Sequence, residues 1–191
     1  FDNYKLTPNG KVHRLLTRLA VENIFHPFQP FMMGQKTVAP RIADAFNIPL
    51  IFYGENEAEY GNPLANNSTS LRNEDFHSAD SYEGLFISGE TIENLRSIFN
   101  LSDNDLDPYL PIKKEVIRRK NIEVHYLGYY VKWHPQDAYY YCIDNTNFKS
   151  SPERTAGTYS KYNSIDDKID DFHFYSYFIK FGIGRATYDA A

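Results

Sequence analysis

Hydrophobic positions recur at helical spacing in two stretches near the start of the chain. Between Gly10 and Phe25, apolar side chains return about every three or four residues, with charged side chains on the opposite side. His26-Pro27 ends this helix, because the residue before a proline disfavours helical backbone. The same spacing runs from Thr37 to Phe46. The pattern therefore predicts amphipathic helices over residues 10–25 and 37–46.

Two short apolar runs flank the second of these helices. The first is Phe31–Gly34, and the second is Ile48–Tyr53, which ends at Gly54. Two apolar strands joined by one helix favour a parallel pair with a right-handed crossover. We therefore expect residues 31–34 and 48–53 to be neighbouring parallel strands whose carboxyl ends open on one cleft.

The remaining segments alternate short helices with one aromatic strand. Spacing and capping residues predict helices over residues 90–99, 113–120 and 135–144, and a last helix from Ser164 to Gly182. They also predict a capped turn or short helix over 102–111. The β-branched and aromatic residues of 122–131 predict a strand. Residues 62–84 are polar and longer than an ordinary connection, so they form either a mobile lid or a solvated insertion. We expect an α/β fold with a parallel-sheet domain over 1–61, a lid or insertion over 62–90, and a mixed, mainly helical region over 91–191.

Composition and charge narrow the class of protein. The 191 residues are 42% hydrophobic, enough for a sizeable core, and 16% aromatic. Twenty Lys and Arg against 25 Asp and Glu give a net charge of −5, which disfavours a nucleic-acid partner. The single cysteine, Cys142, cannot form an internal disulfide, and no apolar run reaches the roughly 20 residues that span a bilayer. We expect a cytoplasmic protein without nucleic-acid or membrane partners.

The two ends of the chain carry a further expectation. The chain opens on Phe1 without a signal-peptide pattern. It closes, after Gly184, on what reads as the first turn of a helix. We therefore expect an internal fragment of a longer protein.

Three carboxylates follow the second apolar strand directly. Glu55, Glu57 and Glu59 come just after Gly54, with the amide of Asn56 among them. Nothing structural requires three acids there, and Mg²⁺ in proteins typically binds one or two carboxylates together with phosphate oxygens. Glu57 and Glu59 are therefore candidate metal ligands and catalytic residues, and Gly54, Glu55 and Asn56 are candidate cofactor contacts. A solvated acidic turn is the alternative.

A second polar cluster precedes the last predicted helix. Arg154 and Lys161, with the hydroxyl of Tyr159, are candidate ligands for the phosphates of a nucleotide-sugar, because a guanidinium binds phosphate oxygens in a bidentate fork. A polar loop is the alternative. Gly34 and Gln35 close the first predicted strand and are candidate nucleotide-pocket residues, with a plain turn as the alternative.

Six segments, taken together and in order, resemble one known family. They are PNGKVHRLLTRLA, HPFQPFMMGQK, IPLIFYGENEAEYG, IEVHYLGYYVKW, PERTAGTYSKYNSIDDKID and KFGIGRATYDA. They look like the N-acetyl sugar amidotransferases of bacterial surface-polysaccharide (lipopolysaccharide, O-antigen) biosynthesis. The strand-ending Gly54 with its acidic and amide cluster resembles the second conserved motif of the wider PP-loop ATP pyrophosphatases.

The resemblance implies a three-layer, adenine-nucleotide α-hydrolase-like fold that uses ATP and Mg²⁺. In the implied reaction, the amide oxygen of a nucleotide-sugar's N-acetyl group is adenylated, and ammonia from a partner glutaminase displaces AMP to leave an acetamidino group. The family's Ser-Gly-Gly-x-Asp-Ser phosphate loop does not occur in this sequence and is expected upstream of Phe1. The isolated chain is then expected to be inactive, although its parent is an enzyme. The alternative is a non-catalytic nucleotide-sugar-binding or partner-docking module.

Overall fold

The chain forms two compact units. The computed structural model describes residues 1–54, 68–132, 134–154, 160–162, 165 and 168–182. Unit 1 comprises Phe1–Gly54 with Asn66–Leu127, and unit 2 comprises Glu55–Ala65 with Gly128–Ala191. Residues 91–127 therefore belong to the same compact unit as residues 1–54, while the expected boundaries at residues 61 and 90 stay a prediction. Unit 1 confirms the α/β class, since it combines helices with small parallel sheets.

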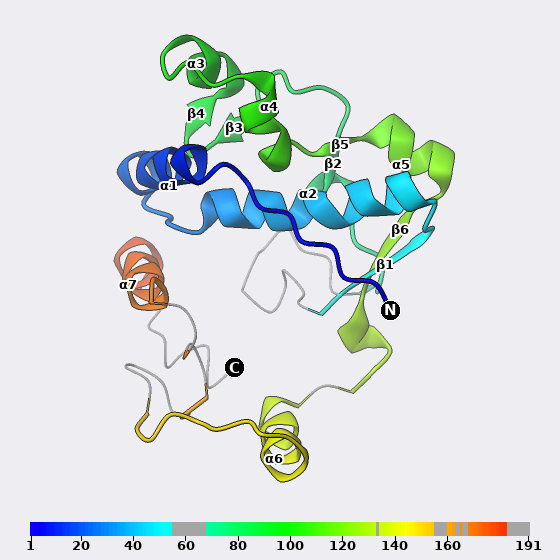
Figure 1. The fold of residues 1–191 in the computed structure, drawn as a ribbon, viewed down its shortest axis with the longest axis vertical. Coiled ribbons are helices and arrows are strands. Elements are labelled where there is room, and N and C mark those ends of the chain that lie inside the picture. The colour runs from blue at the N-terminus through cyan, green and yellow to red at the C-terminus, as the bar shows by residue number, and fades with distance from the viewer. Residues whose placement is uncertain (55–67, 133, 155–159, 163–164, 166–167, 183–191) are drawn as a thin grey trace. The chain divides into compact units, whose positions relative to one another are not determined.

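Figure 1 shows α2 running through unit 1, with the β3–β4 hairpin, α3 and α4 on one side and the β1–β6 pair on the other. The elements of unit 1 are α1 (Gly10–Ile24), α2 (Gln29–Phe46), β1 (Leu50–Tyr53), η2 (Glu74–Phe76), β2 (Ser78–Ala79), β3 (Phe86–Ile87), β4 (Glu90–Thr91), α3 (Ile92–Ser97), α4 (Asp103–Leu106), η3 (Asp107–Tyr109), β5 (Ile112–Lys113), α5 (Lys114–Lys120) and β6 (Glu123–Tyr126). The turn η4 (Leu127–Tyr129) leads into unit 2, where α6 (Pro135–Asn145) and α7 (Asp170–Phe181) lie.

The sheet that matters for the site is built on β1 and β6. These strands are parallel, with Phe52 opposite His125. Residues 70–72 add a short antiparallel segment on the other side of β6. There the Arg72 N–H donates to the Val124 carbonyl oxygen at 2.8 Å, and the Tyr126 N–H donates to the Ser70 carbonyl oxygen at 2.9 Å. The predicted strand over residues 48–53 is therefore confirmed as β1, while part of the predicted lid or insertion belongs to this sheet.

The predicted strand at Phe31–Gly34 is wrong, because these residues lie inside α2. Proline and glycine suggested a break, but Pro30 occupies the first helical turn, where its missing N–H needs no partner. Phe31 is 54% exposed, so the apolar run does not form a strand buried on both faces. Consequently the parallel neighbour of β1 is β6, and the expected pairing of residues 31–34 with 48–53 is also wrong.

Most predicted helices are confirmed, with adjusted ends. The helices expected over residues 10–25, 113–120 and 135–144 correspond to α1, α5 and α6. The capped turn expected from Ser102 is α4, where the Ser102 hydroxyl and the Asp105 carboxylate form a capping box. The last helix is α7 (Asp170–Phe181), which begins later than predicted and has the expected Gly182 as its C-cap. Its predicted N-cap, Ser164, lies outside the described residues. The predicted strand over 122–131 is shorter, because β6 ends at Tyr126.

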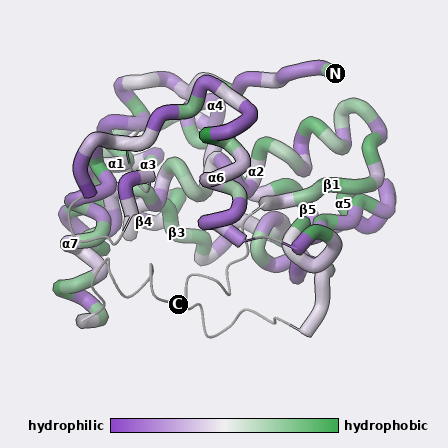
Figure 2. Tube along the Cα trace, turned by 90° about the horizontal axis from the view of Figure 1, so that it is seen from below, coloured by the Kyte–Doolittle hydropathy of each residue, from purple (hydrophilic) through white to green (hydrophobic). Residues whose placement is uncertain are grey.

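Two hydrophobic clusters hold unit 1 together. One joins the buried side of α1 to α3, β3 and η3, and its fully buried members include Leu16, Leu95 and Leu106. The other joins the sheet to α2 and α5 through Ala43, Ile117 and Val124, among others. Figure 2 shows hydrophobic and hydrophilic residues alternating along α1, as expected for a helix buried on one side. Among the described residues, every buried hydrophobic side chain belongs to unit 1.

A histidine and a tyrosine form a partly buried pair between α1 and η3. The Nδ1 atom of His13 lies 3.0 Å from the hydroxyl oxygen of Tyr109. Burial lowers the pKa of His13 below its usual 6.5 and raises the pKa of Tyr109 to about 12. The phenol therefore stays protonated and donates to the neutral imidazole.

We expect the free energy of unfolding to fall below pH 6.5, partly because of this pair. Between the lowered folded-state pKa and 6.5, the unfolded chain binds a proton that the folded chain excludes, so stability is complete above this window and decreases as pH falls through it. Urea denaturation well above and well below pH 6.5 measures the effect. His13→Gln should flatten the pH dependence, whereas His134→Gln, at an exposed position, should not. An unchanged pH dependence in His13→Gln would contradict this assignment.

Candidate functional site

The candidate site lies at the carboxyl end of the β1–β6 pair. Both strands run in the same direction, so Tyr53 and Tyr126 end at one edge of the sheet. Helix α2 lies against this edge, because the Tyr53 hydroxyl donates to the carbonyl oxygen of Gln35 at 3.0 Å. In parallel sheets, this edge is where ligands bind.

A buried arginine lies at the same edge. Arg72 is only 4% exposed, and its guanidinium carbon lies 4.6 Å from the centre of the Tyr53 ring and 5.8 Å from the centre of the Phe76 ring. The ammonium of Lys36, on α2, lies 5.5 Å from the centre of the Phe76 ring. Both cations therefore use the face of the same aromatic ring. A buried guanidinium is stable only when anionic, polar or aromatic groups surround it.

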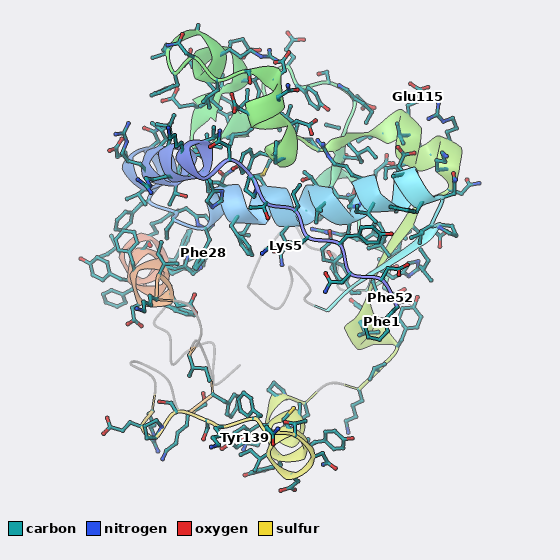
Figure 3. The ribbon with its side chains drawn as sticks, in the orientation of Figure 1. Phe1, Lys5, Phe28, Phe52, Glu115 and Tyr139 are labelled. Carbon is teal, nitrogen blue, oxygen red and sulfur yellow. The ribbon has the colours of Figure 1, made fainter. Side chains whose placement is uncertain are left out.

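The two faces of the sheet differ in character. The face of Ile51 and Val124 is buried against α2 and α5. On the opposite face, Leu50, Phe52 and Leu71 are 44–47% exposed. Figure 3 labels Phe52 on β1. Arg72 lies on the helix-covered side, because its guanidinium contacts the ring of Tyr53. Phe52 and its cross-strand partner His125 lie on the exposed side.

The predicted cofactor residues have different surroundings. Gly54 follows β1 directly, as expected. Gln35 lies beside the carboxyl end of β1, but on a helix rather than at a strand end. Gly34 faces η3, since a Cβ built on it would lie 3.7 Å from the Pro108 carbonyl oxygen. The strand-end argument for Gly34 and Gln35 is therefore wrong, while their proposed contact with a nucleotide stays a prediction.

The predicted metal ligands lie outside the described residues. These are Glu57 and Glu59, together with Glu55 and Asn56. Within the residues that the structure describes, no group of three or more His, Cys, Asp or Glu side chains is arranged to hold a metal ion. In the same part of the chain, no helix is both long enough and apolar enough to cross a membrane.

The second predicted cluster lies in unit 2. The Lys161 ammonium donates to the Pro152 carbonyl oxygen at 2.9 Å, and the Ser151 N–H donates to the Lys161 carbonyl oxygen at 2.8 Å. Arg154 lies on this closed loop and is exposed. Tyr159, the third predicted member, lies outside the described residues. Lys161 keeps two ammonium hydrogens beyond this bond, so the loop can still present positive charge.

An aromatic cluster stands beside this loop within unit 2. The Tyr139 ring stacks on Tyr162 at 4.5 Å between centroids and meets Phe148 edge-on at 6.3 Å. The Tyr162 hydroxyl also donates to the Gln136 side-chain oxygen at 3.1 Å. Figure 3 labels Tyr139 on α6. Such ring faces are suited to stacking on a sugar or a nucleobase.

Arg72 is the main residue that sequence reasoning missed. It lies in a polar stretch without periodicity, and its burial arises from the long-range contact of residues 70–72 with β6. Lys36 was missed because the predicted break between residues 34 and 37 gave no reason to place it on a helix, whereas it lies inside α2. No local signal distinguishes either residue from an ordinary surface cation.

Comparison with known proteins adds no assignment. No family model matches the chain, and no curated protein matches it. Any functional assignment therefore depends on the residues and their geometry.

Proposed function

We propose that this chain is the distal part of an ATP-dependent amidotransferase that converts a sugar N-acetyl group into an acetamidino group in surface-glycan biosynthesis. The observation that supports this most is Arg72, a 4% exposed cation at the carboxyl end of β1. The acidic segment that begins with Glu55 follows that strand after a single glycine. Acids for Mg²⁺ and a cation for phosphate are the two chemical requirements of an adenylating site.

In the proposed reaction, the amide oxygen of the N-acetyl group attacks the α-phosphorus of ATP, and pyrophosphate leaves with the electron pair of the broken P–O bond. Ammonia then adds to the activated carbon, loses a proton, and expels AMP. Glu57 and Glu59 are proposed to hold a Mg²⁺ ion, which would offset negative charge on the phosphates. Arg72 and Lys36 are proposed to offset negative charge as it develops on the equatorial oxygens.

The proposed fold is the three-layer, adenine-nucleotide α-hydrolase-like arrangement, with α2 and α5 as one helix layer on the parallel pair. The phosphate loop is proposed to precede residue 1, in a longer chain that we call the longer enzyme. ATP and an N-acetyl nucleotide-sugar are its proposed substrates, and a glutaminase is its proposed ammonia source.

Magnesium-dependent pyrophosphate release tests the proposal. The longer enzyme is assayed with ATP, ammonia and UDP-N-acetylglucosamine, first as the natural sequence and then as Glu57→Gln with Glu59→Gln. We expect the double variant to lose at least about a hundredfold in rate, because amide oxygens bind Mg²⁺ far more weakly than carboxylates. Glu115→Gln is the matched control, because it makes the same substitution at an acid on α5, outside the acidic segment (Figure 3). Its rate should stay unchanged. An equal rate in the double variant would contradict the metal-binding role and would mean that Glu57 and Glu59 belong to a solvated acidic turn.

The loop that contains Arg154 and Lys161 is proposed to hold the phosphates of the nucleotide-sugar. Arg154→Ala and Lys161→Ala should each weaken the affinity for UDP-N-acetylglucosamine roughly tenfold, the value of one charge-assisted hydrogen bond. Isothermal calorimetry measures this. Lys149→Ala, an exposed lysine in the same unit, should leave the affinity unchanged. If neither loop variant changes the affinity, this loop does not bind the sugar substrate.

A non-catalytic sugar-binding module is the second candidate function. It is favoured by Tyr140 and Tyr141, which are 56% and 67% exposed on α6 beside the stacked Tyr139–Tyr162 pair. Such a module would bind UDP-N-acetylglucosamine with the same affinity whether or not ATP and Mg²⁺ are present. It would also release no pyrophosphate, even as part of a longer chain.

A further inference from the structure

A serine, a histidine and a glutamate are linked by hydrogen-bond contacts between β6 and the segment that pairs with it. The Ser70 hydroxyl oxygen lies 3.3 Å from His125 Nδ1. His125 Nε2 lies 3.1 Å from a carboxylate oxygen of Glu123. The imidazole is mostly buried, with 14% of its side chain exposed, while the Glu123 side chain is 64% exposed.

These contacts determine which atom carries each proton. An ionised carboxylate only accepts, so the proton of the neutral imidazole resides on Nε2 and is donated to Glu123. Nδ1 is then an acceptor, and the Ser70 hydroxyl donates to it. The imidazole is therefore oriented by an acid on one side and is poised to take the proton of a serine hydroxyl on the other. Relative to Ser-His-Asp triads, the two ring nitrogens exchange roles.

Two exposed apolar side chains lie beside His125. Phe52 and Leu71 are the cross-strand neighbours of His125 on either side, and both are 47% exposed. The centre of the Phe52 ring lies 6.1 Å from the centre of the His125 ring. Paired residues of a sheet share one face, so these two side chains form an apolar platform beside the imidazole. Such a platform suits an uncharged acyl chain better than a phosphate or a sugar.

We propose that Ser70, His125 and Glu123 form a second site, which transfers the acyl group of apolar carboxylic esters to Ser70 and hydrolyses it. The Ser70 oxygen bonds to the carbonyl carbon while its proton passes to His125 Nδ1, and Glu123 stabilises the imidazolium. The ester C–O bond then breaks, and the departing alcohol takes the proton from His125. Water then attacks the acyl carbon while His125 Nδ1 takes its proton. The bond between that carbon and the Ser70 oxygen breaks, and the Ser70 oxygen takes the proton back from His125 as the carboxylic acid leaves. This site needs neither ATP nor Mg²⁺.

Active-site labelling of the 191-residue chain tests the proposal. An alkyl fluorophosphonate is added, and peptide mass spectrometry locates the adduct. We expect the adduct on Ser70, together with hydrolysis of p-nitrophenyl butyrate. His125→Gln should slow labelling at least about a hundredfold, and Glu123→Gln should slow it roughly tenfold. The Ser97 hydroxyl donates to the Glu93 carbonyl oxygen in α3, so Ser97 should not be labelled. Ser97→Ala is therefore the control variant, and its labelling should match that of the natural sequence.

The outcome does not depend on any one variant folding. The site of the adduct is read from the unsubstituted chain, and Ser70→Ala should remove it while circular dichroism monitors the fold. An absence of adduct on Ser70, or labelling of Ser70 at the same rate in folded His125→Gln, would overturn the proposal. Neither result bears on the amidotransferase assignment, because labelling is carried out without nucleotide.

Discussion

Replacing Arg72 by methionine is expected to lower magnesium-dependent pyrophosphate release by the longer enzyme at least about a hundredfold. Arg72 is 4% exposed, and its guanidinium carbon lies 4.6 Å from the centre of the Tyr53 ring and 5.8 Å from the centre of the Phe76 ring, at the carboxyl end of β1. A buried, preorganised cation stabilises the charge that develops on the phosphate without first losing bound water. Loss of one such donor typically lowers the rate by about a hundredfold to a thousandfold. Steady-state assay of the variant measures the loss.

Two further variants separate catalysis from folding. Arg72→Lys keeps the charge but loses the planar guanidinium that lies near both rings, so its rate should fall between those of the natural sequence and Arg72→Met. Arg96→Met removes an exposed arginine that pairs with Asp103 elsewhere in unit 1, and its rate should stay unchanged. Thermal unfolding of each variant shows whether it remains folded. A folded Arg72→Met enzyme with the natural rate would contradict the role of Arg72.

The 191-residue chain alone is expected to release no measurable pyrophosphate. In the proposed family, backbone N–H groups of the upstream glycine-rich loop hold most of the phosphate charge, and side chains elsewhere cannot easily replace them. Each lost donor of that kind costs two to three decades in rate, so loss of the whole loop removes catalysis. The measurement compares this chain with the longer enzyme at equal concentration. Equal rates would show that the phosphate site lies within these residues.

Local sequence patterns predicted the helices and turns that are determined by residues close together in the chain. The hydrophobic spacing of α1, the capping box at Ser102 and the glycine after α7 each depend on residues a few positions apart. The run at Phe31–Gly34 misled because proline and glycine act as breakers only at some positions. Pro30 is tolerated in the first turn of α2, and Pro40 is buried within the helix.

The candidate site was less predictable, because it depends on contacts between distant segments. β1 pairs with β6 across about 70 residues of chain, and no local pattern specifies that choice of partner. The same pairing, with the antiparallel contact of Leu71 and His125, buries Arg72 and brings Ser70 to His125. The acidic segment after Gly54 was proposed from sequence, because three neighbouring carboxylates have no structural purpose there, and its role as an ion site stays a prediction. Arg72, the cation that we propose acts with this segment, was not predicted from sequence.

The most direct test of the amidotransferase assignment follows the nitrogen atom. The longer enzyme is incubated with ATP, Mg²⁺, UDP-N-acetylglucosamine and ammonia labelled with heavy nitrogen, and the sugar product is analysed by mass spectrometry. We predict a product in which the acetamido oxygen is replaced by one labelled nitrogen, formed together with AMP and pyrophosphate in equal amounts. A sugar recovered without labelled nitrogen, while the enzyme binds it tightly, would contradict the account and favour the binding module.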